Sequence, residues 1–366
     1  MEREAAVSEA KLTIESLTVR AVVVPLARPL RTASGEIPAA PLLLLDLATA
    51  QGVTGRAYLF AYTRVTLRAL KALMEDLAPL LAGKPVAPQD RAAELERSFR
   101  LLGRQGLLGM ALSGIDMALW DALGRALDQP VAALLGGAPR AIPAYDSFGI
   151  IDIREDARRL ERSLAQGFRA IKIKVGGGDL LKDLAAVREV RGIVGEQVRL
   201  MIDYNQSLSA PEAIRRLQAL KPYDLAWVEE PVPAEDLVGH AAVRAARLAP
   251  VQTGENWWFA GDMAKAIAAG ASDHAMPDLM KIGGITGWLK AAALAEAASL
   301  PVSSHIFIEA SAHVLPVTPG ALYLEYLDKA APILTEPLPV TDGTVTARGP
   351  GLGMEWDERA VAKYAA

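Results

Sequence analysis

Cysteine is absent from the 366-residue sequence, which excludes disulfide bonds and thiolate metal sites. Aromatic residues make up only 5% of the chain, and the net charge of −4 gives no basic excess for nucleic-acid binding. No stretch reaches the ~18 uninterrupted apolar residues of a membrane span, and the charged N-terminus lacks the apolar core of a secretory signal. We therefore expect a cytoplasmic protein without a nucleic-acid or membrane partner, preceded by a disordered tail at residues 1–10.

The abundant residues are apolar, at 51%, and this composition suits a globular chain of two domains or a barrel with an addition. Two β-rich segments, 11–26 and 41–60, predict a three-stranded antiparallel sheet, because a Gln-Gly turn signal divides the second one. Between them, residues 27–40 hold Pro, Gly and Ser without periodicity, and we interpret them as a long functional loop. Apolar residues then recur at helical spacing over 65–81 and 88–127.

Together these segments predict an α+β domain over residues 11–143. From Ala144 onward, short apolar runs alternate with amphipathic segments, which indicates parallel strands joined by crossover helices. Seven or eight such units close into a β/α barrel, which we assign to residues 144–335. We expect residues 336–366 to return to the first domain. The predicted strands are 170–175, 199–203, 225–229, 250–254, 275–279, 301–306 and 321–324.

Two lysines lie one residue apart in the first of these strands. Because side chains alternate along a strand, Lys172 and Lys174 share one face, which in a barrel is the interior. Two neighbouring ammonium groups repel, and burial also disfavours the charged form. We therefore predict that the pKa of at least one of them lies well below the reference value of about 10.4, so that it can act as a base.

Three carboxylates end the next three strands at equal intervals. Asp203, Glu229 and Glu255 are 26 residues apart in each step, so they occupy equivalent points of consecutive strand-helix units. Each residue alone could be a helix cap or a surface acid, but three carboxylates that converge at one barrel mouth require a cation. Oxygen-only ligation favours Mg²⁺, with Mn²⁺ as an alternative ion.

The last strands end in an acid and an imidazole. Asp278 can hold one nitrogen of His305 and so make it a second base, whereas Lys281, a rival base, should face differently. With Lys174 on a distant strand, two bases would flank one carbon and transfer a proton across an enolate. Glu325, kept protonated after the last strand, would donate a hydrogen bond to the substrate carboxylate.

These motifs, in this order, resemble the mandelate racemase subgroup of the enolase superfamily, from about residue 12 to 362. The resemblance implies an α+β capping domain on a (β/α)7β modified TIM barrel, and a homo-oligomer, often an octamer built from dimers. The matching segments are "PLLLLDLATAQGV", "YLFAYT", "GIDMALWDALG", "AYDSFG", "FRAIKIKVG", "DYNQSL", "WVEEP", "GENWW", "AMPDLMKIGGITGW", "SSHIFIEASAH" and "GLGMEW".

The resemblance also implies a role for each polar residue. Lys174 would take the proton of an (S)-enantiomer, and His305, paired with Asp278, that of an (R)-enantiomer. Lys172 and Glu325 would contact the substrate carboxylate. The metal ligands and the two residues that support the metal or the enolate would be Asp203, Glu229, Glu255, Asn205 and Ser147.

Apolar positions of the capping domain and barrel would form the substrate wall. Such a wall suits a phenyl group and would leave sugar hydroxyls unpaired, which is costly. The resemblance therefore implies a Mg²⁺-dependent racemase of mandelate-like α-hydroxy acids. The alternatives are an acid-sugar dehydratase that uses the same bases, and a catalytically silent binding protein. The wall residues are Leu30, Ile37, Phe60, Tyr62, Leu101, Ile306 and Leu327, with Ser34 where mandelate racemase has valine.

Overall fold

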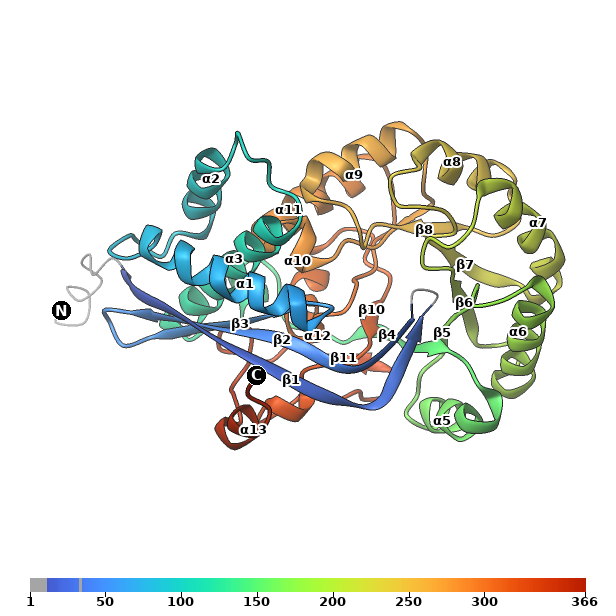
Figure 1. Ribbon diagram of the computed structural model, residues 1–366, viewed down its shortest axis with the longest axis horizontal. Helices are drawn as coiled ribbons and strands as arrows, with labels where there is room; N and C mark the ends of the chain where they lie inside the picture. The colour runs from blue at the N-terminus through green and yellow to red at the C-terminus, as the bar shows by residue number, and fades with distance from the viewer. Residues whose placement is uncertain (1–11, 33–34) are drawn as a thin grey trace.

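The computed structural model describes residues 12–32 and 35–366 (Figure 1). The predicted tail of residues 1–10 and the candidate pocket residue Ser34 lie outside the described residues. The predicted architecture, an α+β domain that caps a modified TIM barrel, is confirmed.

The capping domain is built on an antiparallel sheet of three strands in the order β1-β2-β3. Residues 42–45 of β2 are all buried, because α-helices cover one face of the sheet and the C-terminal segment lies against the other (Figure 1). A Cβ on Gly55 would lie 2.1 Å from the carbonyl oxygen of Ala118, so glycine is what lets β3 and α3 pack this closely. The strands are β1 (Ile14–Thr32), β2 (Gly35–Thr49) and β3 (Thr54–Phe60).

The interpretation of residues 27–40 as a loop is wrong. β1 extends to Thr32 and β2 begins at Gly35, so residues 27–32 and 35–40 form a paired hairpin arm in which Leu30 pairs with Ile37. A register shift between Pro25 and Leu30 accommodates the prolines, which cannot donate to a regular ladder. The non-periodic sequence therefore reflects an irregular hairpin rather than an unpaired connection. The far end of this arm reaches towards the barrel strands (Figure 1).

The helices of the capping domain pack on the sheet. The helical stretch predicted over residues 88–127 is interrupted at 99–106, where Gly103 and Gly106 adopt positive φ angles of 88° and 73°. α3 is long and apolar enough to cross a membrane, but 89% of its apolar window is buried, as expected of a core helix. The helices are α1 (Arg64–Leu77), η1 (Ala78–Leu80), α2 (Pro88–Ser98), α3 (Leu107–Ala126) and α4 (Val131–Leu134).

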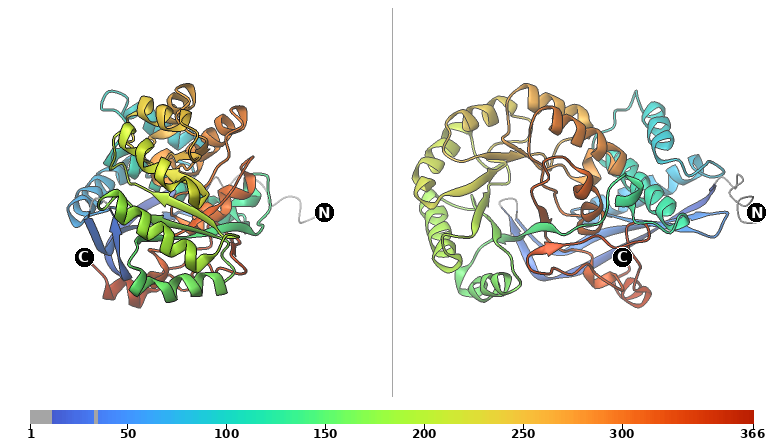
Figure 2. Two further views of the ribbon diagram at one scale, coloured as in Figure 1. Left: turned by 90° about the vertical axis from the view of Figure 1, so that its right-hand side faces the viewer. Right: turned by 180° about the vertical axis from the view of Figure 1, so that it is seen from behind.

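The barrel strands run in the order β10-β4-β5-β6-β7-β8-β9, all parallel. Val302 closes the ring, because it bridges Ala275 on one side and Ala321, just before β10, on the other. Helices surround these strands (Figure 2). The strands are β4 (Ile142–Ile150), β5 (Ala170–Lys174), β6 (Arg199–Asp203), β7 (Leu225–Glu229), β8 (Val251–Thr253), β9 (His274–Ala275) and β10 (Leu324–Tyr326).

Two predicted barrel strands are much shorter than the sequence indicates. Instead of 275–279, only His274–Ala275 is a strand, because Asp278 already caps the next helical turn. Instead of 301–306, there are single bridges at Val302 and His305, since the backbone turns to positive φ at the following two residues. In both places the chain therefore leaves the barrel sheet at the predicted site residue, Asp278 or His305.

The remaining helices follow the strands of the barrel. They are α5 (Ile153–Ala165), α6 (Leu180–Val194), α7 (Ala210–Leu220), η2 (Lys221–Tyr223), α8 (Leu237–Ala245), α9 (Phe259–Ala268), α10 (Leu279–Ile282), α11 (Gly284–Ala297), α12 (Ile308–Val314), η3 (Leu315–Val317) and η4 (Ala331–Ile333).

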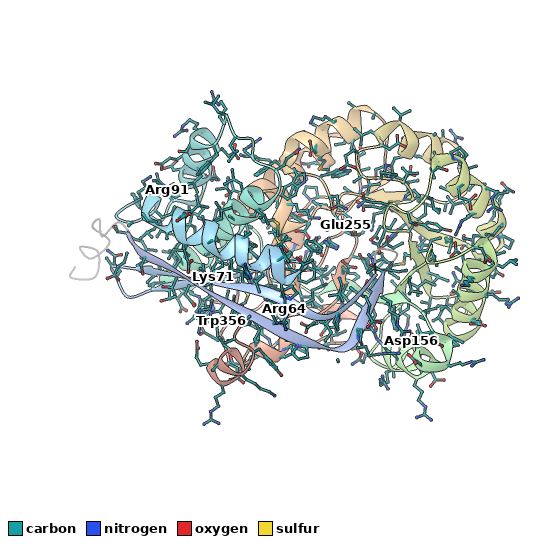
Figure 3. All side chains as sticks on the ribbon, in the orientation of Figure 1. Arg64, Lys71, Arg91, Asp156, Glu255 and Trp356 are labelled. Carbon is teal, nitrogen blue, oxygen red and sulfur yellow. The ribbon has the colours of Figure 1, made fainter. Side chains whose placement is uncertain are left out.

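The C-terminal segment runs back to the first sheet. After β11 (Thr344–Val345), which pairs with β4, the Trp356 indole donates to Asp46 Oδ1 at 2.8 Å. Beyond α13 (Glu358–Lys363), Ala365 bridges Val22 of β1. Figure 3 labels Trp356 beside the antiparallel sheet and Glu255 inside the ring of the barrel. The last residues of the chain therefore lie against β1 of the capping domain.

Candidate active site

Three buried carboxylates meet at the mouth of the barrel. Asp203 and Glu229 end neighbouring strands and are paired in register, and Glu255 follows β8. One oxygen of each lies within 4.8 Å of the others. Glu255 Oε2 and Asn205 Oδ1 are buried and accept no hydrogen bond from the described residues, although Glu255 Oε2 faces His305 Nε2 at 3.3 Å. An all-oxygen site with unsatisfied acceptors fits a hard divalent cation such as Mg²⁺.

The two lysines of β5 point at these carboxylates. Lys172 forms an ion pair with Glu229 and a second one with Glu325 at 2.8 Å, and Lys174 forms an ion pair with Asp203. Burial lowers the pKa of both lysines, but the facing carboxylates outweigh it, so both pKa values lie above the usual value. This is opposite to the predicted direction, because the sequence argument weighed the lysines against each other and omitted their acidic partners.

Glu325 is charged rather than protonated, which also corrects the prediction. Burial raises its pKa, but Lys172 and His305 lower it by more, so the pKa falls well below its usual range. Glu325 Oε2 accepts a hydrogen bond from the backbone N–H of Ile306 at 3.0 Å, which holds the side chain beside the residue that follows His305. Glu325 therefore lies where it was expected, in the opposite protonation state.

His305 and Asp278 form the expected pair. Nδ1 lies 2.5 Å from Asp278 Oδ2, while the other carboxylate oxygen accepts the Met280 N–H at 2.6 Å as the cap of α10. Burial lowers the pKa of His305, but Glu255, 3.3 Å from Nε2, and Asp278 raise it above its usual value. We assign the Nδ1 proton to the bond with Asp278, so Nε2, which faces Glu255 and the cavity, is the nitrogen that would exchange a proton.

One cavity of about 290 Å³ contains both candidate bases, Lys174 and His305. The hairpin arm, β3 and the barrel all contribute to its wall, so the capping domain completes the site. The predicted wall residues that line it are Leu30, Ile37, Phe60, Tyr62, Ile306 and Leu327, and Asn205, Glu255 and Glu325 reach it as well.

Two of the described residues that were predicted to contact the substrate or support the enolate, Leu101 and Ser147, do not line this cavity. Leu101 is fully exposed on the connection after α2. Its assignment to the substrate wall is therefore wrong within a single chain. Ser147 is buried on β4 in register with Lys172, and its hydroxyl has no hydrogen-bond partner among the described residues. It therefore lies beside the lysine pair, deeper in the barrel.

Sequence reasoning missed two lysines of the cavity wall. Lys281 was expected to face away, but Asp278 begins a helical turn, which returns the third residue to the same side. Its Nζ donates to Asn256 Oδ1 at 2.6 Å. Lys329 follows Glu325 by four residues, beyond the end of β10, where strand alternation no longer indicates direction. Asp278, as a helix-capping residue three positions before Lys281, was a sequence signal that could have indicated the direction of that lysine. No comparable signal precedes Lys329.

Comparison with known proteins identifies the family. Residues 14–136 match the mandelate racemase / muconate lactonizing enzyme N-terminal domain, and residues 155–360 match the enolase C-terminal domain-like family. A crystal structure of an enolase from Bradyrhizobium complexed with magnesium and mandelic acid is 57% identical, with a TM-score of 0.95, over 98% of this chain and 99% of that one. A racemase from Streptomyces coelicolor A3(2) with bound magnesium is 30% identical, with a TM-score of 0.89, over 96% of this chain and 100% of that one.

Curated relatives include enzymes of other reactions. A 3,6-anhydro-alpha-L-galactonate cycloisomerase from Streptomyces coelicolor is 32% identical over 88% of this chain and 91% of its own. An L-talarate/galactarate dehydratase from Salmonella typhimurium is 27% identical over 95% of this chain and 90% of its own. Since both domains match across their length, the chain belongs to the enolase superfamily, in its mandelate racemase subgroup.

Proposed function

We propose that the protein is a Mg²⁺-dependent isomerase that racemises a mandelate-like α-hydroxy acid by 1,1-proton transfer. The observation that carries the proposal is that Lys174, at the end of β5, and His305, just before α12, line one cavity. The carboxylate cluster contacts both, because Asp203 pairs with Lys174 and Glu255 lies 3.3 Å from His305 Nε2. The 57% identical Bradyrhizobium structure, which contains magnesium and mandelic acid, supports the same metal and substrate class. A cytoplasmic location and a dimer-based homo-oligomer stay predictions of the sequence.

In this proposal, Lys174 Nζ removes the α-proton of the (S)-enantiomer and His305 Nε2 delivers a proton to the opposite face, and the roles reverse for the (R)-enantiomer. A bound Mg²⁺, held by Asp203, Glu229 and Glu255, would neutralise the charge that develops on the carboxylate oxygens. Lys174 must release Asp203 before it can act as a base, because a lysine in that ion pair holds its proton. Asp203 would give up this ion pair if it held a metal ion together with Glu229 and Glu255.

Lys172 would contact the substrate carboxylate, since it lies between the carboxylates of Glu229 and Glu325. Glu325 is charged beside Lys172 and His305, so it must take up a proton before it can donate a hydrogen bond to an incoming carboxylate. Entry of the substrate anion favours that uptake, because like charges raise a carboxyl pKa. The apolar wall would then hold the side chain of the substrate.

A second candidate is an acid-sugar dehydratase, in which the same proton abstraction is followed by loss of a β-hydroxyl. Polar residues in the cavity favour this alternative, namely Thr32, Gln206, Asn256 and Lys281. The L-talarate/galactarate dehydratase relative also supports it. The apolar residues from the hairpin arm and from Phe60 favour the racemase.

The deciding experiment follows the α-proton of (R)- and (S)-mandelate in D₂O by NMR, with optical rotation and a 2-keto acid assay on mandelate and a panel of aldonates. Exchange from both enantiomers with loss of rotation and no keto product supports racemisation. Keto product from an aldonate, without exchange of mandelate, would establish the dehydratase instead. A catalytically silent protein would exchange neither enantiomer.

The same assay tests the two bases. His305→Asn should keep exchange of the (S)-enantiomer through Lys174 but lose racemisation. His274→Asn is the matched control, since that histidine lies half-buried on β9 and does not line the cavity. Its exchange rates should equal those of the unchanged protein. Equal loss from both enantiomers in His305→Asn would contradict the two-base assignment.

A further inference from the structure

Lys329 is a buried cation in the wall of the proposed substrate cavity. It is only 6% exposed and follows β10, the strand that holds Glu325. It lines the cavity that contains both candidate bases, and it also lines the neighbouring cavity under the hairpin arm, together with Leu30 and Leu327. Lys329 therefore shares both cavities with Leu30 and Leu327, two of the residues predicted to contact the substrate side chain.

The ammonium of Lys329 forms no direct ion pair with a carboxylate in the part of the chain that the structure describes, although Glu325, Asp278 and Asp328 act on it from farther away. Lys172 and Lys174 each form ion pairs with carboxylates, and Lys281 donates to Asn256. Lys329 Nζ instead lies 5.0 Å from the centroid of the Phe60 ring. A cation–π contact offsets only part of the cost of removing an ammonium from water. Among the three buried lysines compared with it, Lys329 therefore differs in that its ammonium faces an aromatic ring rather than a carboxylate or an amide oxygen.

The electrostatic environment agrees with that description. Burial and, to a smaller extent, Lys174 lower the pKa of Lys329, whereas Glu325 raises it, and the resulting pKa is about 8. Lys329 is therefore mostly protonated at neutral pH, at the expense of desolvation. Such a group is stabilised by an anion that enters the cavity, and it disfavours an apolar ligand that would cover it without a hydrogen bond.

We propose that Lys329 determines specificity by binding a carboxylate on the side chain of the α-hydroxy acid, remote from the reacting carbon. This inference rests on the proposed function and deepens it, because it names the substrate class as α-hydroxy acids with a second, distal anionic group. Leu30, Phe60 and Leu327 contact the apolar part of the side chain, and Lys329 binds its end.

The test compares substrates that differ only at that end. The Mg²⁺-loaded full chain is assayed for α-proton exchange with para-carboxymandelate and with para-methylmandelate, which has a similar shape and no charge. An aldarate and the matching aldonate form a second pair, which separates an aromatic carrier of the carboxylate from a polyol carrier. We expect the carboxylated member of at least one pair to have a kcat/KM about tenfold higher or more, because a site built for a polar group rejects the analogue that lacks it.

Two variants assign that preference to Lys329. Lys329→Met keeps the length and removes the charge, and it should abolish the preference, mainly by raising KM for the carboxylated compound. Lys363→Met is the matched control, because Lys363 also lies over an aromatic ring, at 5.1 Å from the Tyr364 centroid, but on the exposed surface. It should leave the preference unchanged. Lys329→Arg keeps the charge and should retain the preference if Lys329→Met fails to fold.

Two results would overturn the inference: no preference for the carboxylated compound in either pair, or a preference that survives in folded Lys329→Met. Failure of the proposed function would look different, because the unchanged protein would then either exchange the α-proton of none of these compounds or convert the aldarate or aldonate to a 2-keto acid.

Discussion

Replacing Asp278 by asparagine tests the paired histidine most directly. Asp278 is fully buried, and each of its oxygens has a separate task. Oδ2 lies 2.5 Å from His305 Nδ1, whereas Oδ1 caps α10 through the Met280 N–H at 2.6 Å. Asparagine has the same size and keeps one oxygen for the cap. The substitution therefore removes the charge beside His305 and retains the turn.

The size of the effect follows from that one bond. A hydrogen bond to a charged group contributes about 1.5–3 kcal/mol and a neutral one about 0.5–1.5 kcal/mol, so the loss is about 1–1.5 kcal/mol. One pKa unit corresponds to about 1.36 kcal/mol, so the pKa of His305 should fall by about one unit. Exchange of the (R)-enantiomer through His305 should slow about tenfold, or more if the tautomer is disturbed.

Exchange of the two enantiomers is measured separately in D₂O by NMR. In Asp278→Asn, the (S)-enantiomer should exchange at nearly its original rate through Lys174, and racemisation should fall as far as (R)-exchange does. Asp273→Asn is the control, because Asp273 pairs with Arg244 at 2.7 Å outside the cavity. An equal loss for both enantiomers, or no loss for either, would refute the reasoning.

Three further predictions concern stability. Mg²⁺ at 100 times its Kd should raise the free energy of unfolding by about 2.7 kcal/mol, and calorimetry should show no such gain in Asp203→Asn. Burial raises the pKa of Asp116 to about 7, so the folded chain holds this proton more tightly and stability falls as pH rises from about 4 to 7. Asp116→Asn should flatten that slope in urea titrations, and an unchanged slope would contradict the assignment. Gly55→Ala should cost about 1–3 kcal/mol, because its Cβ would lie 2.1 Å from the Ala118 oxygen, whereas Gly192→Ala, with nothing within 4 Å, should not destabilise.

The carboxylate cluster could be predicted because its position depends on regular geometry. Equal 26-residue intervals imply equivalent places in consecutive strand-helix units, and the parallel register does bring Asp203 level with Glu229. The alternation of side chains along β5 likewise places both lysines in the barrel. These inferences need only the period of a strand, which the sequence contains.

The remaining features depend on contacts that no local pattern encodes. The lysine pKa values depend on which carboxylates face Lys172 and Lys174 across the barrel. Lys281 and Lys329 lie beyond the ends of their strands, where alternation stops. The hairpin arm was hidden by its prolines, because pairing across a register shift has no period. Long-range partners, rather than local propensity, decide each of these cases.

The hairpin arm has a consequence for how such an enzyme can change. Leu30, Thr32 and Ile37 line the cavity from β1 and β2, two strands that contain none of the proposed metal ligands or proton-transfer residues. Natural variation in this arm can therefore alter which compound is accepted while the proton-transfer machinery stays intact. New preferences within this lineage can arise by exchange of one short, peripheral ribbon.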